Sequence, residues 1–193
     1  MRIILVRHGE VLRHIDNPSL TKIGNKQVPY LAKKLKSFKI DVIYSSDLKR
    51  ARQTAMIIGK LLKQKVIFDS SLREIPDEII ETSPSNWKKR KHDLKGIKQV
   101  KKFLNELQKN HREQTVLLVG HAKTNRLIVS ILTKINPRSL LFFNQGHCNI
   151  ALLDYGERYV SDFRKKIYGW KVKLWNSQEH LPKNLRTGVN KER

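Results

Sequence analysis

The sequence Arg7-His8-Gly9 brings together three residue types that can bind and attack a phosphoryl group. An imidazole can act as the nucleophile on phosphorus while a guanidinium neutralises the phosphoryl oxygens, and glycine lets the backbone approach a ligand closely because it has no Cβ. The apolar run Ile3-Ile4-Leu5 leads into this triplet and predicts a buried strand that ends at it. A short triplet of this kind also occurs by chance as a turn with a surface histidine, so its meaning depends on matching groups downstream.

A second basic group follows a second apolar segment. Asp41-Val-Ile-Tyr44 is typical of a buried strand, and the residues after it predict a loop that enters a helix. Ser46 or Asp47 is expected to cap this helix, and Arg50 lies in its opening turns. The free backbone donors of a helix N-terminus attract anions, so Arg50 is placed where it could reach an anion near the strand ends.

A second histidine ends a third predicted strand. The strand Thr115-Val-Leu-Leu-Val119 leads into Gly120-His121, and a helix is expected over about residues 124–132. In a parallel α/β sheet the carboxyl ends of the strands line one crevice, where ligands bind. His8 and His121 are therefore expected to face the same crevice, although a single histidine at a strand end is more often a satisfied core residue.

In combination, these motifs resemble the histidine phosphatase superfamily, the group that contains the cofactor-dependent phosphoglycerate mutases and many small phosphatases. The resemblance covers nearly the whole chain. Each motif alone is a weak signal, but their common order is a strong one. The matching segments are Leu5-Val-Arg-His-Gly-Glu10, Leu20-Thr21 with Gly24 and Gln27, Tyr44-Ser-Ser-Asp-Leu-Lys-Arg-Ala-Arg-Gln-Thr-Ala55, Leu72-Arg-Glu74, Val119-Gly-His121 with Arg126, and Asn176 with His180-Leu181.

The resemblance implies an α/β fold, a three-layer α/β/α sandwich of the phosphoglycerate mutase-like type. Its central sheet is expected to be mostly parallel with one antiparallel edge strand, supplied by one of the closing segments 150–154 and 170–175. Helices are expected over about 22–38, with Pro29 kinking it or shifting its start, and over about 97–109. A single domain is expected over residues 1–181, with a possible substrate lid at 76–96 and a loosely held basic tail at 182–193.

The family pattern also implies residue roles. His8 would be the nucleophile and form a phosphohistidine, while Arg7, Arg50 and His121 would hold the phosphoryl group with help from the Gly9 backbone. Fixed cations and donors stabilise the charge of a transferring phosphoryl group, so neither a metal nor another cofactor is expected. Glu74 would protonate the leaving oxygen and then accept a proton from the attacking water, an acid role that burial favours by raising its pKa.

Several assignments keep alternatives at this stage. Glu74 lies in a charged stretch that would by itself be read as a solvated loop, and Asp77 or Glu78 could take its place. The segment after Glu10 lacks the hydroxyl and amide that many family members carry, and Arg13 or His14 could replace those phosphate contacts. The Gly and the Trp-Glu-Gly that often follow the Leu-x-Glu motif are also missing.

Other basic residues have less clear roles. Lys123, at a position where small residues are common in the family, is expected either to add a cation near the substrate or to be an ordinary exposed lysine. Arg52 is expected to be a surface charge because it points away from Arg50 on the helix. The remaining histidines considered have no partner at metal-ligand spacing and are expected to be structural or exposed; they are His111, His147 and His180.

The overall charge bounds the partners. Forty Lys and Arg against 17 Asp and Glu give a formal net charge of +23, which predicts attraction to anions. The basic residues are dispersed and match no nucleic-acid motif, so weak attraction to anionic surfaces is expected rather than specific nucleic-acid binding. The single Cys148 excludes an internal disulfide, and we expect a cytoplasmic protein without a signal peptide or transmembrane segment.

The sequence therefore predicts a metal-independent phosphatase that hydrolyses a small, anionic phosphomonoester. The short, basic segment available as a lid favours an open site that admits water. A phosphoglycerate mutase-like phosphotransferase and a non-catalytic phosphate-binding protein remain as alternatives. The sequence leaves the leaving group of the substrate and the oligomeric state open.

Overall fold

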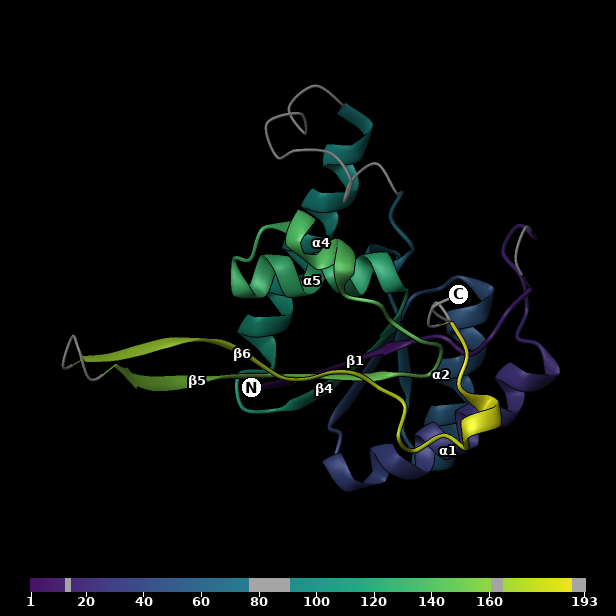
Figure 1. Cartoon of the computed structure of the whole chain (residues 1–193). Coiled ribbons are helices and arrows are strands. Elements are labelled where there is room, and N and C mark those ends of the chain that lie inside the picture. The colour runs from purple at the N-terminus through teal and green to yellow at the C-terminus, as the bar shows by residue number, and fades with distance from the viewer. Residues whose placement is uncertain (13–14, 77–90, 161–164, 189–193) are drawn as a thin grey trace.

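Helices cover both faces of one central sheet in the computed structural model, as Figure 1 shows. The structure describes residues 1–12, 15–76, 91–160 and 165–188. The principal elements are β1 (Arg2–Arg7), α1 (Lys22–Leu35), β2 (Val42–Ser45), α2 (Lys49–Leu62), β3 (Val66–Phe68), α4 (Lys91–Asn110), β4 (Thr115–Gly120), α5 (Ala122–Thr133), β5 (Ile150–Val160) and β6 (Lys165–Ser177).

The sheet has six strands in the order β3-β2-β4-β1-β5-β6. The first four run parallel to one another, β5 runs antiparallel to β1, and β6 pairs antiparallel with β5. The predicted three-layer, mostly parallel architecture is thus confirmed, and the antiparallel strand is β5, one position in from the edge. Strand β3 was not predicted because it is only three residues long and its central Ile67 is 47% exposed, which gives no buried apolar run.

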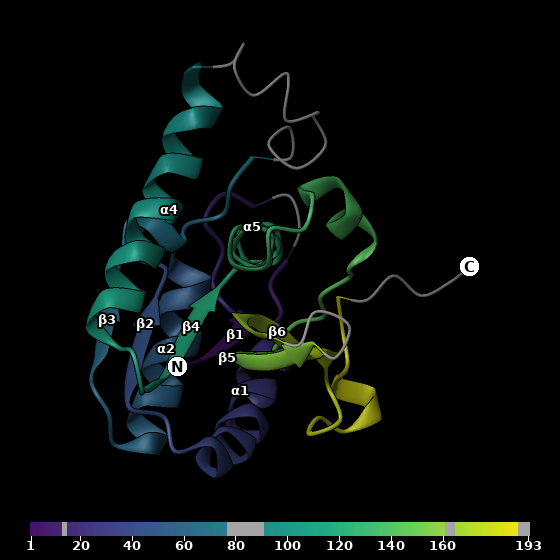
Figure 2. The same ribbon diagram turned by 90° about the vertical axis from the view of Figure 1, so that its left-hand side faces the viewer.

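Two apolar clusters hold the layers together. Alternate side chains of β1 point to opposite faces, so Ile3 and Leu5 pack against α4 and α5, whereas Ile4 and Val6 pack against α1 and α2. Figure 2 shows α4 and α5 on one side of the sheet and α1 on the other. Because both faces are covered, β1 and β4 read as continuous apolar runs in the sequence.

Three helix predictions differ in detail from the structure. Helix α1 continues through Pro29 to Leu35, and α4 and α5 begin earlier than predicted. Neither Ser46 nor Asp47 caps α2, whose N-cap is Leu48 without a side-chain bond. Both candidate caps are engaged elsewhere: the Ser46 hydroxyl contacts His121, and the Asp47 carboxylate accepts hydrogen bonds from Arg73.

The segment after β6 is more ordered than the expected loose tail. Lys183–Leu185 form a 3-10 turn that contacts α1, and the Leu185 side chain is buried. The Gln27 amide of α1 donates to the Leu185 carbonyl at 2.7 Å, and His147 donates its backbone N–H to the Thr187 carbonyl at 2.9 Å. Residues 182–188 therefore differ from the loosely held tail that was predicted, because these long-range hydrogen bonds tie them to the domain.

Most of the predicted lid at 76–96 lies outside the described residues, as do Arg13, His14, Asp77 and Glu78. Their predicted roles stay predictions. Within the described ranges, no helix combines the length and apolar character needed to cross a lipid bilayer.

Candidate active site

The carboxyl ends of β1, β2 and β4 converge on one edge of the sheet. The His8 backbone N–H donates to the Gly120 carbonyl at 3.0 Å, and the Ser46 N–H donates to the Val119 carbonyl at 2.9 Å. These bonds bring the residues that follow each strand next to one another, as expected for parallel strands. His8, Ser46 and His121 therefore lie together at this edge of the sheet.

His8 is buried, with 2% of its surface exposed, and its hydrogen bonds determine where its proton lies. Its Nδ1 lies 2.7 Å from the Gly9 carbonyl oxygen, which can only accept, so Nδ1 carries the proton. The Arg50 Nε–H donates to His8 Nε2 at 3.1 Å, so Nε2 presents a lone pair. Burial, followed by the positive fields of His121 and Arg7, lowers the pKa of His8 well below its usual range, which keeps the ring neutral.

Two arginines stand beside this imidazole. Arg50 extends from the first turn of α2, is half-buried and directs its Nε–H at the His8 lone pair. Arg7 precedes His8 in β1, and its Nη1 donates to the Gln145 carbonyl at 2.6 Å. Two guanidinium groups next to one imidazole concentrate positive charge at this edge of the sheet, which an anion such as a phosphoryl group could neutralise.

His121 faces His8 from the end of β4. The two ring centroids lie 5.2 Å apart in an edge-to-face arrangement, and the His121 ring is fully buried. Its Nε2 lies 3.0 Å from the Ser46 hydroxyl, whereas its buried Nδ1 makes no hydrogen bond within the described part of the chain. Burial, followed by Arg50 and Arg7, lowers the pKa of His121 well below its usual value. A bound anion would supply the partner that Nδ1 lacks.

Glu74 is the carboxylate of this site. One of its oxygens lies 3.7 Å from His121 Nδ1, and the other accepts the Lys123 backbone N–H at 3.1 Å. Burial raises the pKa of Glu74 although Lys123, Arg7 and Arg50 act in the opposite direction. The structure therefore brings Glu74 next to the predicted phosphate pocket with a pKa shifted toward the protonated form, as a general acid requires.

Gly9 and Lys123 complete the described candidates. An ideal Cβ on Gly9 would lie 3.1 Å from the Gly24 carbonyl oxygen, so the absence of a side chain allows the loop after β1 to pack closely on α1. The Gly9 N–H donates to the Thr54 hydroxyl at 3.0 Å. Lys123 lies half-buried in the first turn of α5, and its charge acts on Glu74, which puts the ammonium on the carboxylate side of the site.

The other basic residues considered in the sequence make contacts of their own. Arg52 is exposed, and its guanidinium carbon lies 4.2 Å from the centroid of the Phe68 ring. This position agrees with the predicted surface charge. His111 contacts the Tyr44 hydroxyl, and His180 contacts the Cys148 carbonyl, so both are structural as predicted. Arg126 donates to the Phe143 carbonyl at 2.8 Å.

His147 is bonded to Thr187, which agrees with the predicted structural role, but the sequence did not indicate its position near His8. It is 8% exposed, and its ring centroid lies only 5.6 Å from that of His8, at the edge where the phosphate pocket forms. No spacing pattern singled it out, because it follows an irregular loop and precedes β5. Ile150 pairs with Val6, so the start of β5 lies beside the end of β1. Knowledge of this strand register would have indicated that His147 lies near His8.

Metal binding and the chemistry available to the site can be judged from the same residues. Among the described side chains, no group of three or more His, Cys, Asp and Glu is arranged to hold a metal ion. The arrangement offers a neutral imidazole lone pair, two guanidinium groups and a carboxyl group with a raised pKa. This combination can perform nucleophilic phosphoryl transfer with acid and base assistance.

Comparisons with known proteins show which proteins the chain resembles. A family model described as histidine phosphatase superfamily (branch 1) matches residues 3–165. Phosphoserine phosphatase 1 of Hydrogenobacter thermophilus is 29% identical over 186 residues, which cover 82% of this chain and 88% of that protein. Probable phosphoglycerate mutase GpmB of Escherichia coli O1:K1 / APEC is 28% identical over 209 residues, covering 94% and 95%.

Solved structures share the fold. A mycobacterial glucosyl-3-phosphoglycerate phosphatase in complex with inorganic phosphate aligns with a TM-score of 0.71 and 20% identity, covering 94% of this chain and 99% of that one. A phosphoserine phosphatase mutant of Entamoeba histolytica in complex with phosphoserine aligns with a TM-score of 0.69 at 20% identity and the same coverage. These likenesses support the predicted phosphoglycerate mutase-like fold.

Proposed function

Because the chain belongs to the histidine phosphatase superfamily (branch 1), we propose that it is a phosphatase that hydrolyses a small phosphomonoester through a phosphohistidine on His8. The matches support a phosphoric-ester hydrolase as the enzyme class. The observation that carries the proposal is the protonation of His8. Its Nδ1 donates to Gly9, and its Nε2 lone pair accepts the Arg50 Nε–H, so Nε2 can attack phosphorus once Arg50 turns this donor to a phosphoryl oxygen.

The reaction proceeds in two balanced steps. In the first, His8 Nε2 attacks phosphorus, the bond from phosphorus to the ester oxygen breaks, and Glu74 gives its proton to the departing alkoxide. In the second, the Glu74 carboxylate takes a proton from water, the water oxygen attacks phosphorus, and the bond to Nε2 breaks to release inorganic phosphate. Arg7, Arg50 and His121 hold the phosphoryl oxygens in both steps, with no requirement for a metal ion.

We expect the substrate to be a small organic phosphate that carries a second anionic group. Lys123 lies on the Glu74 side, where the leaving group departs, and its ammonium can bind a carboxylate or a second phosphate. By their names, two of the relatives act on phosphoserine and on glucosyl-3-phosphoglycerate, and both compounds carry a carboxylate beside the phosphate. Phosphate contacts from Arg13 or His14 stay a prediction.

A phosphoglycerate mutase-like transferase is the second candidate, because one relative bears the name of a probable mutase. A mutase would return the phosphoryl group of His8 to a second hydroxyl and would keep water away from it. The two functions share every pocket residue named above and differ in the acceptor, so only an assay of products distinguishes them.

Turnover of p-nitrophenyl phosphate in excess EDTA tests the proposal directly. We expect hydrolysis that EDTA leaves unchanged, with no conversion of 3-phosphoglycerate to 2-phosphoglycerate when 2,3-bisphosphoglycerate is added as a primer. Isomerisation without hydrolysis would replace the phosphatase with the mutase. Absence of both activities, with phosphate still bound, would favour a non-catalytic binding protein.

The pH dependence of kcat/KM follows from the two shifted groups. His8 must be neutral to attack, and its lowered pKa keeps it neutral to a pH below the usual histidine value of 6.5, so activity falls only at more acidic pH. Glu74 must be protonated to act as an acid, and its pKa is raised above 4.5, so activity falls again as the pH rises through that raised value. We expect a bell-shaped profile, measured with an alkyl phosphate, whose alkaline limb disappears in Glu74→Gln. An unchanged alkaline limb in that variant would assign the limb to another group.

A further inference from the structure

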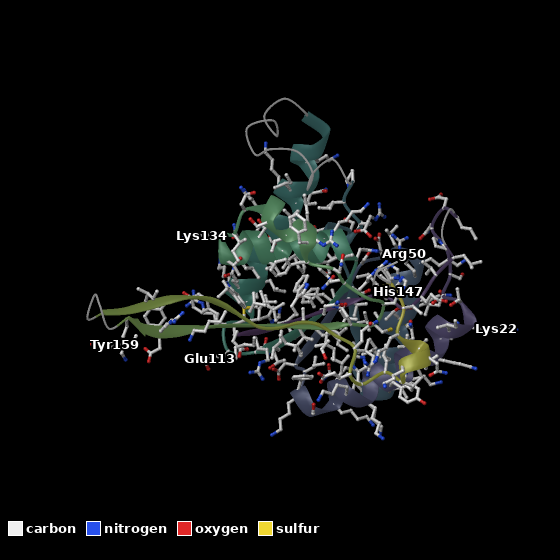
Figure 3. All side chains as sticks on the ribbon, viewed as in Figure 1. Lys22, Arg50, Glu113, Lys134, His147 and Tyr159 are labelled. Carbon is white, nitrogen blue, oxygen red and sulfur yellow. The ribbon has the colours of Figure 1, made fainter. Side chains whose placement is uncertain are left out.

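A third imidazole, that of His147, lies near His8. It precedes β5, whereas the His121 imidazole follows β4. His147 lies two residues before Asn149, whose side-chain oxygen accepts the Arg7 backbone N–H at 3.2 Å. The Cys148 N–H, next to His147, donates to the His8 carbonyl at 3.2 Å. These bonds explain why the rings of His147 and His8 are only 5.6 Å apart. In Figure 3 the labelled His147 and Arg50 lie at the same end of the sheet.

Thr187, from the C-terminal segment, holds the His147 ring. His147 Nδ1 lies 2.9 Å from the Thr187 hydroxyl, and the His147 backbone N–H donates to the Thr187 carbonyl. The Gln27 amide donates to the same hydroxyl at 2.8 Å, and its orientation is unambiguous because its oxygen accepts the Glu10 N–H. The hydroxyl keeps its own proton, and when it donates this proton to Nδ1 the ring proton of His147 lies on Nε2, the tautomer in which Nε2–H can donate to a ligand.

The C-terminal segment also brings His147 next to Arg7. Gly188 has a φ of +78°, and an ideal Cβ there would lie 2.7 Å from His147 Nδ1 and 3.0 Å from Arg7 Nη1. Only a glycine fits between these two groups in this backbone conformation. Gln178 fixes the same corner by donating to the His147 carbonyl at 2.7 Å and to the Thr187 carbonyl at 3.2 Å.

Buried donors without partners occur on this same segment. The side-chain nitrogens of Gln145 and Asn149 are buried and make no hydrogen bond within the described ranges. Gln145 also accepts the Arg7 Nη1 donation through its carbonyl. Unsatisfied buried donors are rare in folded proteins and are expected where a ligand completes the site. Residues 145–149 therefore offer donors on the side of His8 that His121 does not cover.

We propose that His147 is a further phosphate-binding residue of this site and that Thr187 is the residue that positions it. The proposal rests on the proposed function and extends it. The ligand group is a phosphoryl oxygen, to which His147 donates Nε2–H alongside the guanidinium of Arg7. In this arrangement residues 185–188 are part of the active site, because they fix both the orientation and the tautomer of the ring.

His147→Asn is the informative substitution, because the asparagine amide can replace Nδ1 toward Thr187 but has nothing in the place of Nε2. We expect KM for p-nitrophenyl phosphate and the inhibition constants of inorganic phosphate and orthovanadate to rise about 10-fold, while kcat changes by less than about 3-fold. His111→Asn is the matched control, because His111 is bonded to Tyr44 and Gln114 outside the site, and it should leave these constants unchanged.

Thr187 provides the test of positioning. Thr187→Val keeps the shape but removes the hydroxyl, so we expect the inhibition constant of phosphate to rise by about 3-fold or more, and Thr187→Ser should restore it. A purely structural role of Thr187 would lower the melting temperature of the valine variant without changing phosphate affinity. That result, or equal phosphate affinity in His147→Asn and the wild type, would overturn the proposal.

The outcome for the proposed function is read separately. If the wild type hydrolyses phosphomonoesters and His147→Asn has unchanged constants, the function stands and this inference fails. If the wild type shows no hydrolysis, calorimetric titration with orthovanadate decides: weaker binding to His147→Asn than to the wild type supports the role of His147, whereas equal or absent binding refutes it.

Discussion

His8→Ala is expected to abolish hydrolysis of p-nitrophenyl phosphate, with kcat lowered by roughly 10³-fold or more, because no other group among the described residues offers a lone pair at the same point. His121, the nearest imidazole on the Glu74 side, is turned toward Ser46 and Glu74. The variant keeps Arg7 and Arg50, so it should still bind inorganic phosphate. Steady-state kinetics with calorimetry on the same preparation measures both effects.

A trapping experiment identifies the intermediate. Wild-type protein mixed with labelled substrate and quenched in base should retain label in an acid-labile bond, as a phosphoramidate does, and His8→Ala should retain none. His111→Ala, a substitution away from the pocket at a histidine bonded to Tyr44, is the control and should behave as the wild type. Label that persists in His8→Ala, or kcat within about 10-fold of the wild type, would exclude His8 as the nucleophile.

The site residues that could be predicted are those that follow strands with a clear apolar pattern. His8 and His121 each come after a continuous buried run, β1 and β4, and Arg50 lies in the first turn of the helix after β2. Because β1, β4 and β2 are parallel neighbours in the sheet, their carboxyl ends lie at the same edge. The sequence predicted their convergence for this reason, and the structure adds the distances and the protonation of His8.

Glu74 was predicted from the family pattern alone. Its charged surroundings in the sequence indicate a solvated loop, yet one of its oxygens accepts the Lys123 N–H and the other faces His121. The signal that local composition could not give is the contact between this loop and the start of α5, where the Thr124 hydroxyl donates to the Arg73 carbonyl at 2.7 Å.

His147 and the C-terminal segment could not be predicted because no periodic element positions them. Their geometry depends on residues with positive φ, among them Cys148 at +51°, Asn176 at +54° and Gly188 at +78°. Glycine and asparagine are residue types that adopt such a conformation readily, whereas a cysteine gives no signal of it in a sequence. The composition indicated a polar tail. In the structure, hydrogen bonds from the side chains of Gln27 and Gln178 hold residues 185–188 in place, and composition does not reveal such individual bonds.

Glu74→Gln is expected to slow the cleavage of alkyl phosphates far more than that of p-nitrophenyl phosphate. An alkoxide leaves poorly without a proton, so loss of the acid should lower kcat for phosphoserine by about 10²–10⁴-fold. p-Nitrophenolate is a weak base and leaves without help, so the first step with that substrate should change little. Glutamine keeps an oxygen that can accept the Lys123 N–H, which limits structural disturbance.

The same variant separates the two steps of the reaction. Glu74 also acts as the base that activates water, so in Glu74→Gln the phosphohistidine should accumulate with p-nitrophenyl phosphate. Stopped-flow measurement should then show a burst of about one equivalent of p-nitrophenol per active site followed by slow turnover. Glu106→Gln is the control, because Glu106 is exposed and its ion pair with Lys102 spans 3.9 Å on the surface of α4.

The leaving-group dependence decides which carboxylate is the acid. Equal rate losses for phosphoserine and p-nitrophenyl phosphate would mean that Glu74 acts on binding or on the pocket rather than on the departing oxygen. Unchanged rates for both would transfer the acid role to Asp77 or Glu78, the alternatives that its sequence neighbourhood offers. A selective loss would instead identify Glu74 as the proton donor, because only the protonation of a poor leaving group distinguishes the two substrates.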